Sequence, residues 1–136
     1  MKKQFALMLL LATLLPFAAC KKDAEINAIL AEFDSFTTEM VKRVESAPNP
    51  SAGVDDAQKY FDSNKAKVMA RMDAIKGLRG YQVSKETEEK MTTSLVADAS
   101  KVAGLEIKYV SQSVSNPAFK AKLDKLVNDY RTLFAQ

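Results

Sequence analysis

Apolar residues recur every three or four positions along most of this 136-residue chain, and few turn-forming residues interrupt them. This period is that of one face of an α-helix. The chain holds only four glycines and four prolines, so its turns are few and the helices between them are long. No segment shows the alternation of apolar and polar residues that is typical of a strand. The sequence therefore predicts an all-α protein.

Four segments carry this helical period, and together they predict one domain over residues 23–136. We place them near residues 23–47, 55–76, 84–113 and 117–133. Four amphipathic helices joined by short loops most simply build an antiparallel bundle in which the chain runs up, down, up and down. The two longest helices, at 1.5 Å per residue, would reach about 36–45 Å. The expected fold is thus an elongated antiparallel four-helix bundle.

Polar and turn-forming residues mark where these helices begin and end. Residues 48–53 combine two prolines, Asn, Ser and Gly and predict the longest loop. Asp55, with Gln58 three residues later, has the pattern of a capping box and predicts the start of the second helix. Asn116 followed by Pro117 predicts the start of the fourth helix, because proline at the first helical position loses no hydrogen bond.

The apolar stripes of the helices differ in width. The first and fourth helices carry narrow stripes of the coiled-coil kind; their members are Ile26, Ile29, Phe33, Phe36, Met40 and Val44 in the first, and Phe119, Leu123, Leu126, Tyr130 and Leu133 in the fourth. The third helix has two apolar edges, one made of Val96, Ala99, Ala103, Ile107, Val110 and Val114 and the other of Leu95, Val102, Leu105 and Tyr109. So wide a face predicts neighbouring helices on both sides of the third helix.

The first twenty residues have the three-part layout of a secretory signal. Residues 1–4 are basic, residues 5–15 are apolar apart from one threonine, and two alanines stand directly before Cys20. A membrane-spanning helix needs about 20 apolar residues, and this run is shorter. The sequence therefore predicts a cleaved signal peptide over residues 1–19 rather than a retained membrane helix.

The cleavage site narrows this prediction further. Residues 17–20, Phe-Ala-Ala-Cys, resemble the lipobox of bacterial lipoproteins. The resemblance implies that the thiol of Cys20 receives a diacylglyceryl group, that the bond between Ala19 and Cys20 is cleaved, and that residues 20–22 form a short tether. An ordinary signal peptide that leaves Cys20 as a free thiol is the alternative. Cys20 is the only cysteine, and a lone thiol in an oxidising exported compartment would be a liability.

The lipid anchor also implies a location. In lipoproteins of bacteria with two membranes, Asp directly after the lipidated cysteine is associated with retention at the inner membrane, and Lys21 stands there in this chain. We therefore expect attachment to the outer membrane facing the periplasm, with the inner membrane and the cell surface as alternatives. The expected partners are the membrane, through the N-terminal lipid, and an envelope protein. Lys and Arg number 20 against 17 Asp and Glu and are dispersed along the chain, which is no footprint for nucleic acid.

The residue types present exclude several kinds of chemistry. The chain has no histidine, so Ser-His and Cys-His nucleophilic sites, haem ligation and most transition-metal sites are excluded. No glycine-rich phosphate loop is present. Met69 and Met72, with Met40 and Met91, offer thioethers for Cu(I), but their helical spacing favours core packing. We expect no enzymatic activity, no cofactor and no metal site.

What remains is a binding function. The catalytically bare bundle and its anchor predict a non-enzymatic binding or scaffold module of the cell envelope. Two alternatives are a periplasmic stress chaperone and a carrier of a small apolar ligand. The carrier would hold its ligand in a groove between helices lined by aromatic residues, for which the candidates are Phe33, Phe36, Tyr60, Phe61, Tyr109 and Tyr130. Asn64 and Glu106 lie beside apolar stripes, and we expect them at the stripe edges, in reach of water.

Overall fold

The protein is all-α, as the sequence predicts. The computed structural model describes residues 17–78 and 82–134, with side chains described from Lys22 onward, and no strand occurs in these ranges. Its helices are α1 (Phe17–Glu45), α2 (Pro50–Lys76), α3 (Lys85–Lys108), α4 (Val110–Ser115) and α5 (Pro117–Arg131). The predicted signal segment up to residue 16 lies outside the described residues. The side chain of Cys20 lies outside them as well.

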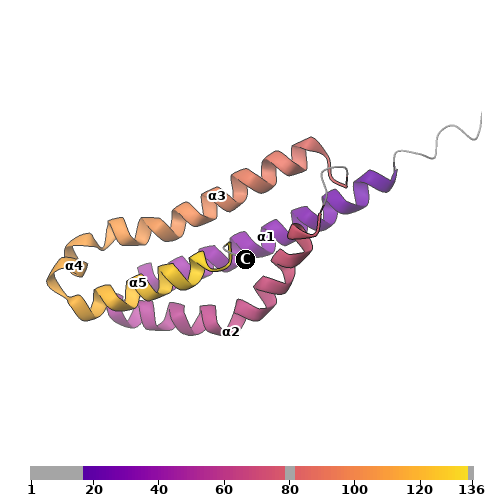
Figure 1. Ribbon diagram of the computed structural model, residues 1–136. Helices are drawn as coiled ribbons and strands as arrows, with labels where there is room; N and C mark the ends of the chain where they lie inside the picture. The colour runs from indigo at the N-terminus through magenta and orange to yellow at the C-terminus, as the bar shows by residue number, and fades with distance from the viewer. Residues whose placement is uncertain (1–16, 79–81, 135–136) are drawn as a thin grey trace, which may run out of the picture.

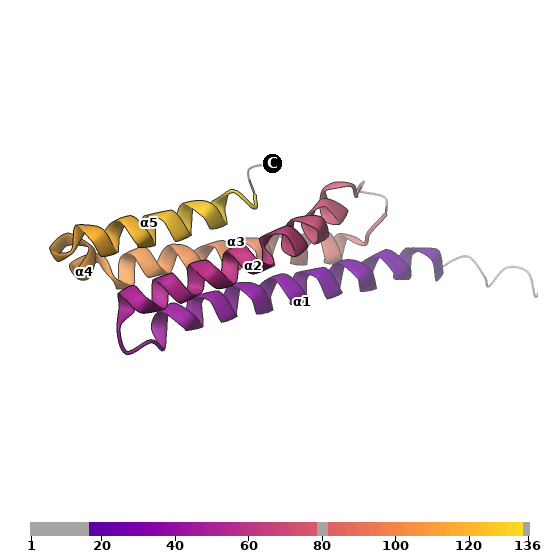
Figure 2. The ribbon, with the colours of Figure 1, turned by 90° about the horizontal axis from the view of Figure 1, so that it is seen from below.

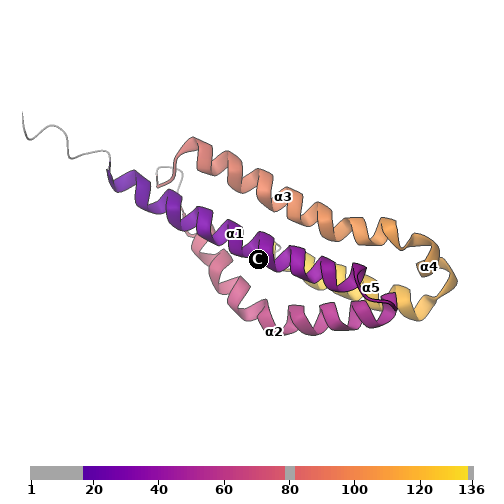
Figure 3. The same ribbon diagram turned by 180° about the vertical axis from the view of Figure 1, so that it is seen from behind.

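The long helices form an elongated bundle around a shared core (Figure 1). Helix α1 packs against both α2 and α3, and α5 packs against the same two helices from the other side. The chain direction alternates along the sequence, so α1 and α3 run one way while α2 and α5 run the other (Figures 1 and 3). Helices α2 and α3 stand on opposite sides of α1, and the last turn of α2 and the first turn of α3 lie at the same end of the bundle (Figures 1 and 2).

Apolar side chains from all four long helices fill the core. The narrow stripes predicted for the first and fourth helices are buried in full. The core cluster reaches from Ile26 in α1 to Leu133 just beyond α5, so a chain that starts at Lys21 contains all of it. The predicted core role of the methionines is confirmed, because Met40 and Met72 are buried and the other two pack against the cluster.

The turn between α1 and α2 is shorter than the sequence predicts. The predicted loop over residues 48–53 is wrong, because α2 already begins at Pro50. Asn49 caps this helix, its side-chain oxygen accepting hydrogen bonds from Ser51 N at 2.9 Å and Ala52 N at 3.4 Å. Asp55, the predicted cap, instead lies inside α2 and pairs with Lys122 of α5. A proline at the first helical position and an Asn cap favour this earlier start.

Helix α2 crosses close to α1 directly after this turn. A β-carbon added at Gly53 would lie 2.7 Å from Cβ of Ala47 and 2.8 Å from the carbonyl oxygens of Arg43 and Val44. Only glycine lets the two backbones approach this closely. Gly53 is therefore not a loop residue, as the sequence suggests, but a helical residue at which α1 and α2 pack closely.

Helix α2 then diverges from α1, bends near its middle and turns back toward α1 (Figures 1 and 3). The side chains of Ser63 and Asn64 donate hydrogen bonds to the carbonyl oxygens of Lys59 and Tyr60, each at 2.8 Å. Side chains that bond the carbonyl one turn back compete with the helical ladder and bend a helix. Two such bonds in succession lie in the middle part of α2.

The third predicted helix is interrupted near its end. Its longer part, α3, packs against α1 and α5. Helix α3 ends at Lys108, Tyr109 adopts φ −104° and ψ 19°, and α4 follows at once. The edge with Leu95, Val102, Leu105 and Tyr109 packs against the core. The prediction of neighbours on both sides is confirmed, because α3 packs against both α1 and α5. The outward edge itself is exposed; its exposed large members are Val96, Ile107, Val110 and Val114.

The N-terminal part of α1 is tied to the start of α3. Its N-terminal end begins at Phe17, upstream of the predicted start, and carries Cys20 in its first turn. Asp23 accepts a hydrogen bond from Ser84 N at 2.8 Å and so ties α1 to the start of α3. This bond from the backbone lowers the pKa of Asp23 below its usual range.

Within the described residues, no helix combines the length and apolar character needed to cross a membrane.

Candidate binding groove between α1 and α2

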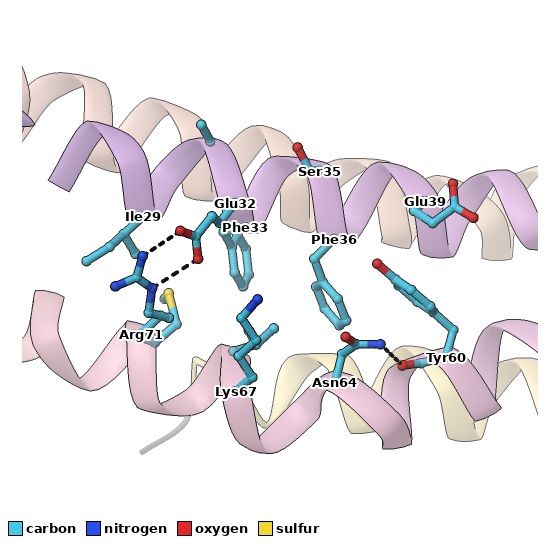
Figure 4. Close-up of a pocket in the computed structure, with 13 residues that line it drawn as sticks. Ile29, Glu32, Phe33, Ser35, Phe36, Glu39, Tyr60, Asn64, Lys67 and Arg71 are labelled. Atoms are coloured by element: carbon cyan, nitrogen blue, oxygen red, sulfur yellow. Dashed lines mark hydrogen bonds and ion pairs between the residues drawn. The ribbon is translucent and has the colours of Figure 1, made fainter. Parts of the chain in front are cut away.

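A groove runs between α1 and the bent part of α2 (Figure 4). Its volume is about 590 Å³, which lies in the range of small-molecule sites. Helix α2 stands apart from α1 at its bend (Figures 1 and 3), and the groove occupies this space. Both walls are helical, so rigid elements position the side chains that line the groove. The lining includes Glu32, Phe33, Phe36, Tyr60, Asn64 and Arg71.

The floor of the groove is aromatic. Phe33 and Phe36 point from α1 toward α2, and the ring of Phe36 stacks on that of Tyr60 with 5.6 Å between centroids (Figure 4). Phe61 and Tyr130 lie behind Phe36, with centroids 6.0 and 6.5 Å away. Offset and tilted ring pairs of this kind add to the stability that burial alone provides. The floor is therefore a fixed apolar surface.

Charged side chains form the mouth. The guanidinium of Arg71 makes a two-pronged ion pair with the carboxylate of Glu32, with Nε 3.0 Å from Oε2 (Figure 4). This hydrogen bonding raises the pKa of Arg71 and lowers that of Glu32. At the other end, the guanidinium of Arg43 lies 4.6 Å from the ring centre of Tyr60, a cation–π contact. Both guanidinium groups are paired with carboxylates: Arg71 with Glu32, and Arg43 with Asp56 at 2.8 Å and Glu39 at 3.0 Å.

Asn64 supplies the polar group inside the groove. Its side chain is half-buried, its amide nitrogen donates to the carbonyl oxygen of Tyr60, and its amide oxygen faces the groove (Figure 4). The expectation that Asn64 reaches water at a stripe edge therefore holds only in part. Glu106, given the same expectation, is half-exposed and pairs with Arg131 of α5 at 2.9 Å.

The six aromatic candidates for a ligand groove separate into three groups. Phe33, Phe36 and Tyr60 line the groove together. Phe61 and Tyr130 are fully buried behind it and belong to the core. Tyr109 lies far along the bundle, where its ring meets that of Phe119 at 5.8 Å. Helical spacing identified all six as apolar, but the bend in α2 decides which of them meet the open space.

A second polar site, which the sequence did not reveal, lies between α1 and α3. Asp98 is 1% exposed, and one of its oxygens accepts a hydrogen bond from the ammonium of Lys101 at 2.9 Å. The same ammonium pairs with Asp34 and lies 3.3 Å from the hydroxyl of Thr38. The other oxygen of Asp98 has no hydrogen-bond partner. One lysine thus pairs with two carboxylates, one buried and one exposed.

Burial and pairing act in opposite directions on these two carboxylates. Burial raises the pKa of Asp98, since the charged form is poorly solvated, while the hydrogen bond from Lys101 lowers the pKa of Asp34. Among the described residues, no group of three or more acidic, His or Cys side chains is arranged to hold a metal ion. The cluster is closed by its own ion pairs, so the groove is the better candidate for binding.

Comparison with known proteins adds no relative to this geometry. No family model, curated protein or solved structure matches the chain.

Proposed function

We propose that the protein is a non-enzymatic binding module of the bacterial envelope, lipid-anchored at Cys20, and that the groove between α1 and α2 is its binding site. One observation carries this proposal: an open space of about 590 Å³ has a fixed aromatic floor and a charged mouth. Such a combination of apolar walls and a few converging polar groups is typical of ligand sites. The function as carrier of a small apolar ligand is thereby favoured over a stress chaperone, because the site is one bounded groove.

The lining defines the chemistry of the ligand. An apolar or aromatic body fits against Phe33, Phe36 and Tyr60, and an acidic group fits at Arg71. The ion pair of Arg71 with Glu32 is about half-exposed on both sides, so it contributes little to stability and exchanges readily. A ligand carboxylate or sulfonate can take the place of Glu32 in the same two-pronged geometry. We therefore infer an amphipathic ligand with an anionic group.

A fluorescent probe of this chemistry tests the groove. Anilinonaphthalene sulfonate combines an aromatic body with one negative charge, and we expect saturable binding to the wild-type protein. Val68→Glu places a carboxylate in the apolar lining and should weaken binding at least about tenfold, or about 1.4 kcal/mol. Arg71→Ala, at an exposed position, should also weaken it while leaving the fold intact. Ala70→Glu, on the exposed opposite side of α2, is the matched control.

The result that would contradict this proposal is equal binding by all four proteins. Binding lost only in a variant with reduced helix content by circular dichroism would not count as a groove effect, and the Arg71→Ala protein guards against that outcome. Native mass spectrometry of the protein isolated from its own membranes should then reveal a small anionic amphiphile that Val68→Glu fails to retain.

The anchor requires its own test. Cys20 stands six residues before Ile26, the first core residue, which is about 9 Å along α1. A lipid at this position would hold the bundle close to the headgroups, with the α2–α3 end toward the membrane. Mass spectrometry of the mature N-terminus should find an acylated Cys20, and Cys20→Ala should release the protein from the membrane fraction. Full-length, unacylated protein in the soluble fraction of its own cells would end the proposal.

A further inference from the structure

Between Thr92 and Ile107, the outward face of α3 carries no charged residue. Val96 and Ile107 are 61% and 78% exposed, and Val114 of α4 is 80% exposed. Large exposed apolar side chains that line up along one helix face mark a contact surface. Charged residues make up 27% of this chain, so their absence from a face of this length is a specific feature of α3.

The charges that α3 carries beyond Thr92 are turned toward its neighbours in the bundle. Lys101 and Lys108 pair with carboxylates of α1, and Glu106 pairs with Arg131 of α5. Asp98 is buried in the core-facing side. The outward face between these edges is thus left to small and apolar residues, which are Val96, Ala99, Ser100, Ala103, Gly104 and Ile107.

The small residues at the centre of this face suit another helix at short range. A β-carbon built at Gly104 would meet nothing within 4 Å, so the fold of one chain gains no close contact from this glycine. Glycine is among the poorest residues for a helix interior. Small side chains let the backbones of two helices approach closely. Gly104, with Ala103 beside it, therefore indicates where a second helix would cross most closely.

We propose that a second copy of this chain docks on this face, with the two α3 helices antiparallel. The face is symmetric in sequence: the small residues lie at its centre, and Val96 and Ile107 lie at equal distances on either side. A two-fold axis through the centre places Val96 of one copy beside Ile107 of the partner subunit. By the same axis, Ile107 of the first copy lies beside Val96 of the partner subunit, as a two-fold interface requires.

Charge selects the antiparallel arrangement over a parallel one. The stripe continues toward the start of α3 through Glu89 and Lys85, both exposed. In a parallel pair, each would face its own copy, and like charges placed opposite one another disfavour an interface. In the antiparallel pair, the two first turns of α3 lie at opposite ends.

The size of the face sets the strength of the dimer. From Thr92 to Ile107 the stripe is about 23 Å long, and α3 with α5 beside it is about 20 Å wide. Each copy would bury roughly 500 Å², about 1,000 Å² in total, which is the lower limit for a specific interface. We therefore expect a dissociation constant in the micromolar range or weaker.

Sedimentation measurements on residues 21–136 test the dimer. We expect a monomer–dimer equilibrium between about 1 µM and about 1 mM. Ile107→Glu, at a position that is 78% exposed, should raise the dissociation constant by at least about tenfold without changing the fold. Ala70→Glu on α2 adds the same charge away from this face and should leave the dimer intact. A monomer at every concentration, or a dimer that survives Ile107→Glu, would overturn the proposal.

Cysteine cross-linking tests the orientation. Cys20 is the only natural cysteine, so residues 21–136 contain none. Two variants, Val96→Cys and Ile107→Cys, should form a disulfide-linked dimer when mixed under mild oxidation and much less when each is oxidised alone. Efficient linkage of Val96→Cys to itself would overturn the antiparallel arrangement.

Discussion

Tyr130 and Thr37 satisfy each other's hydroxyl groups inside the core. Their oxygen atoms lie 2.7 Å apart, and both side chains are buried. Burial raises the pKa of Tyr130, so its hydroxyl stays protonated. Tyr130→Phe would leave the Thr37 hydroxyl buried without a partner, and we expect a loss of about 1–3 kcal/mol in the free energy of unfolding.

Urea denaturation measures this loss, and a double-mutant cycle identifies its cause. Thr37→Val combined with Tyr130→Phe removes both hydroxyls, so the double variant should be about as stable as the less stable single variant, or more so. Strictly additive losses would show that the two hydroxyls do not depend on one another.

Asp98 makes the stability of the protein depend on pH. Its pKa is raised by burial in the folded state, so the folded protein binds this proton more tightly than the unfolded chain does. The contribution of Asp98 therefore favours folding at low pH and is lost as pH rises through the folded pKa. Asp98→Asn keeps an acceptor for Lys101 but cannot ionise. Its stability relative to wild type should increase from about pH 3 to about pH 7.

Parallel denaturant titrations of both proteins across this pH range check the prediction. Asp34, whose pKa is lowered by Lys101 and also depends on Asp98, is present in both proteins, so the difference between them reports on the pair of carboxylates. A difference that stays constant with pH would mean that Asp98 has the same pKa folded and unfolded.

The sequence contained a signal for the burial of Asp98 that its charge concealed. Position 98 lies between Leu95 and Val102 at spacings of three and four, so it completes the buried edge of α3. A pattern that counts only apolar residues omits it. The partner that makes burial tolerable, Lys101, is one turn away, but Asp34 lies on another helix and cannot be inferred from spacing.

At the scale of the helices, two residues could cap the start of α2: Asn49, which does so in the structure, and Asp55, which the sequence predicts. Asn49 accepts hydrogen bonds from the first turn, whereas Asp55 lies inside the helix in an exposed ion pair. Asn49→Ala should therefore cost about 1 kcal/mol of unfolding free energy. Asp55→Ala should change it by about 0.5 kcal/mol or less, because exposed ion pairs contribute little. Thermal or urea denaturation of the two variants checks the order, and the reverse order would restore Asp55 as the cap.

Replacing each of two helical glycines with alanine should change the free energy of unfolding in opposite directions. Gly53→Ala places a methyl group against the α1 backbone, where overpacking typically costs about 1–3 kcal/mol. Gly104→Ala meets nothing within 4 Å and should stabilise the monomer by up to about 1 kcal/mol through helix propensity. Denaturation at a protein concentration well below dimer formation measures both. If Gly53→Ala also stabilised the protein, the close crossing of α1 and α2 would be absent.

The periodicity of the sequence predicted which residues are buried better than it predicted where the helices bend. Every member of the α1 and α5 stripes is in the core, because one buried face per helix leaves a regular pattern. The bend in α2 depends on two side-chain bonds to carbonyls, and Ser63 and Asn64 look like ordinary surface residues. The groove is a consequence of that bend, so its aromatic lining was predicted only as a set of candidates.

For the molecule as a whole, neighbour relationships were the hardest feature to predict. Four helices with alternating direction fit the observed bundle, but α3 packs beside α1 rather than beside α2. Periodicity reports how wide an apolar face is and not what covers it. The width of this face predicted that α3 has two neighbours, which are α1 and α5, but not that the edge from Val96 to Val114 is exposed, where the second copy proposed above would pack.

The independence of the bundle from its N-terminal segment is a property of the whole chain. Among the residues whose side chains the structure describes, the buried core runs from Ile26 to Leu133, and Asp23 ties α1 to the start of α3. Residues 21–136 should therefore unfold in one cooperative step, within about 0.5 kcal/mol of a chain that keeps residues 1–20. A chain starting at Asn27 loses Ile26, which is 1% exposed, and the Asp23 bond, and should lose about 2–5 kcal/mol. Urea denaturation of the three chains decides, since a core that reached upstream of residue 21 would make the first truncation costly as well.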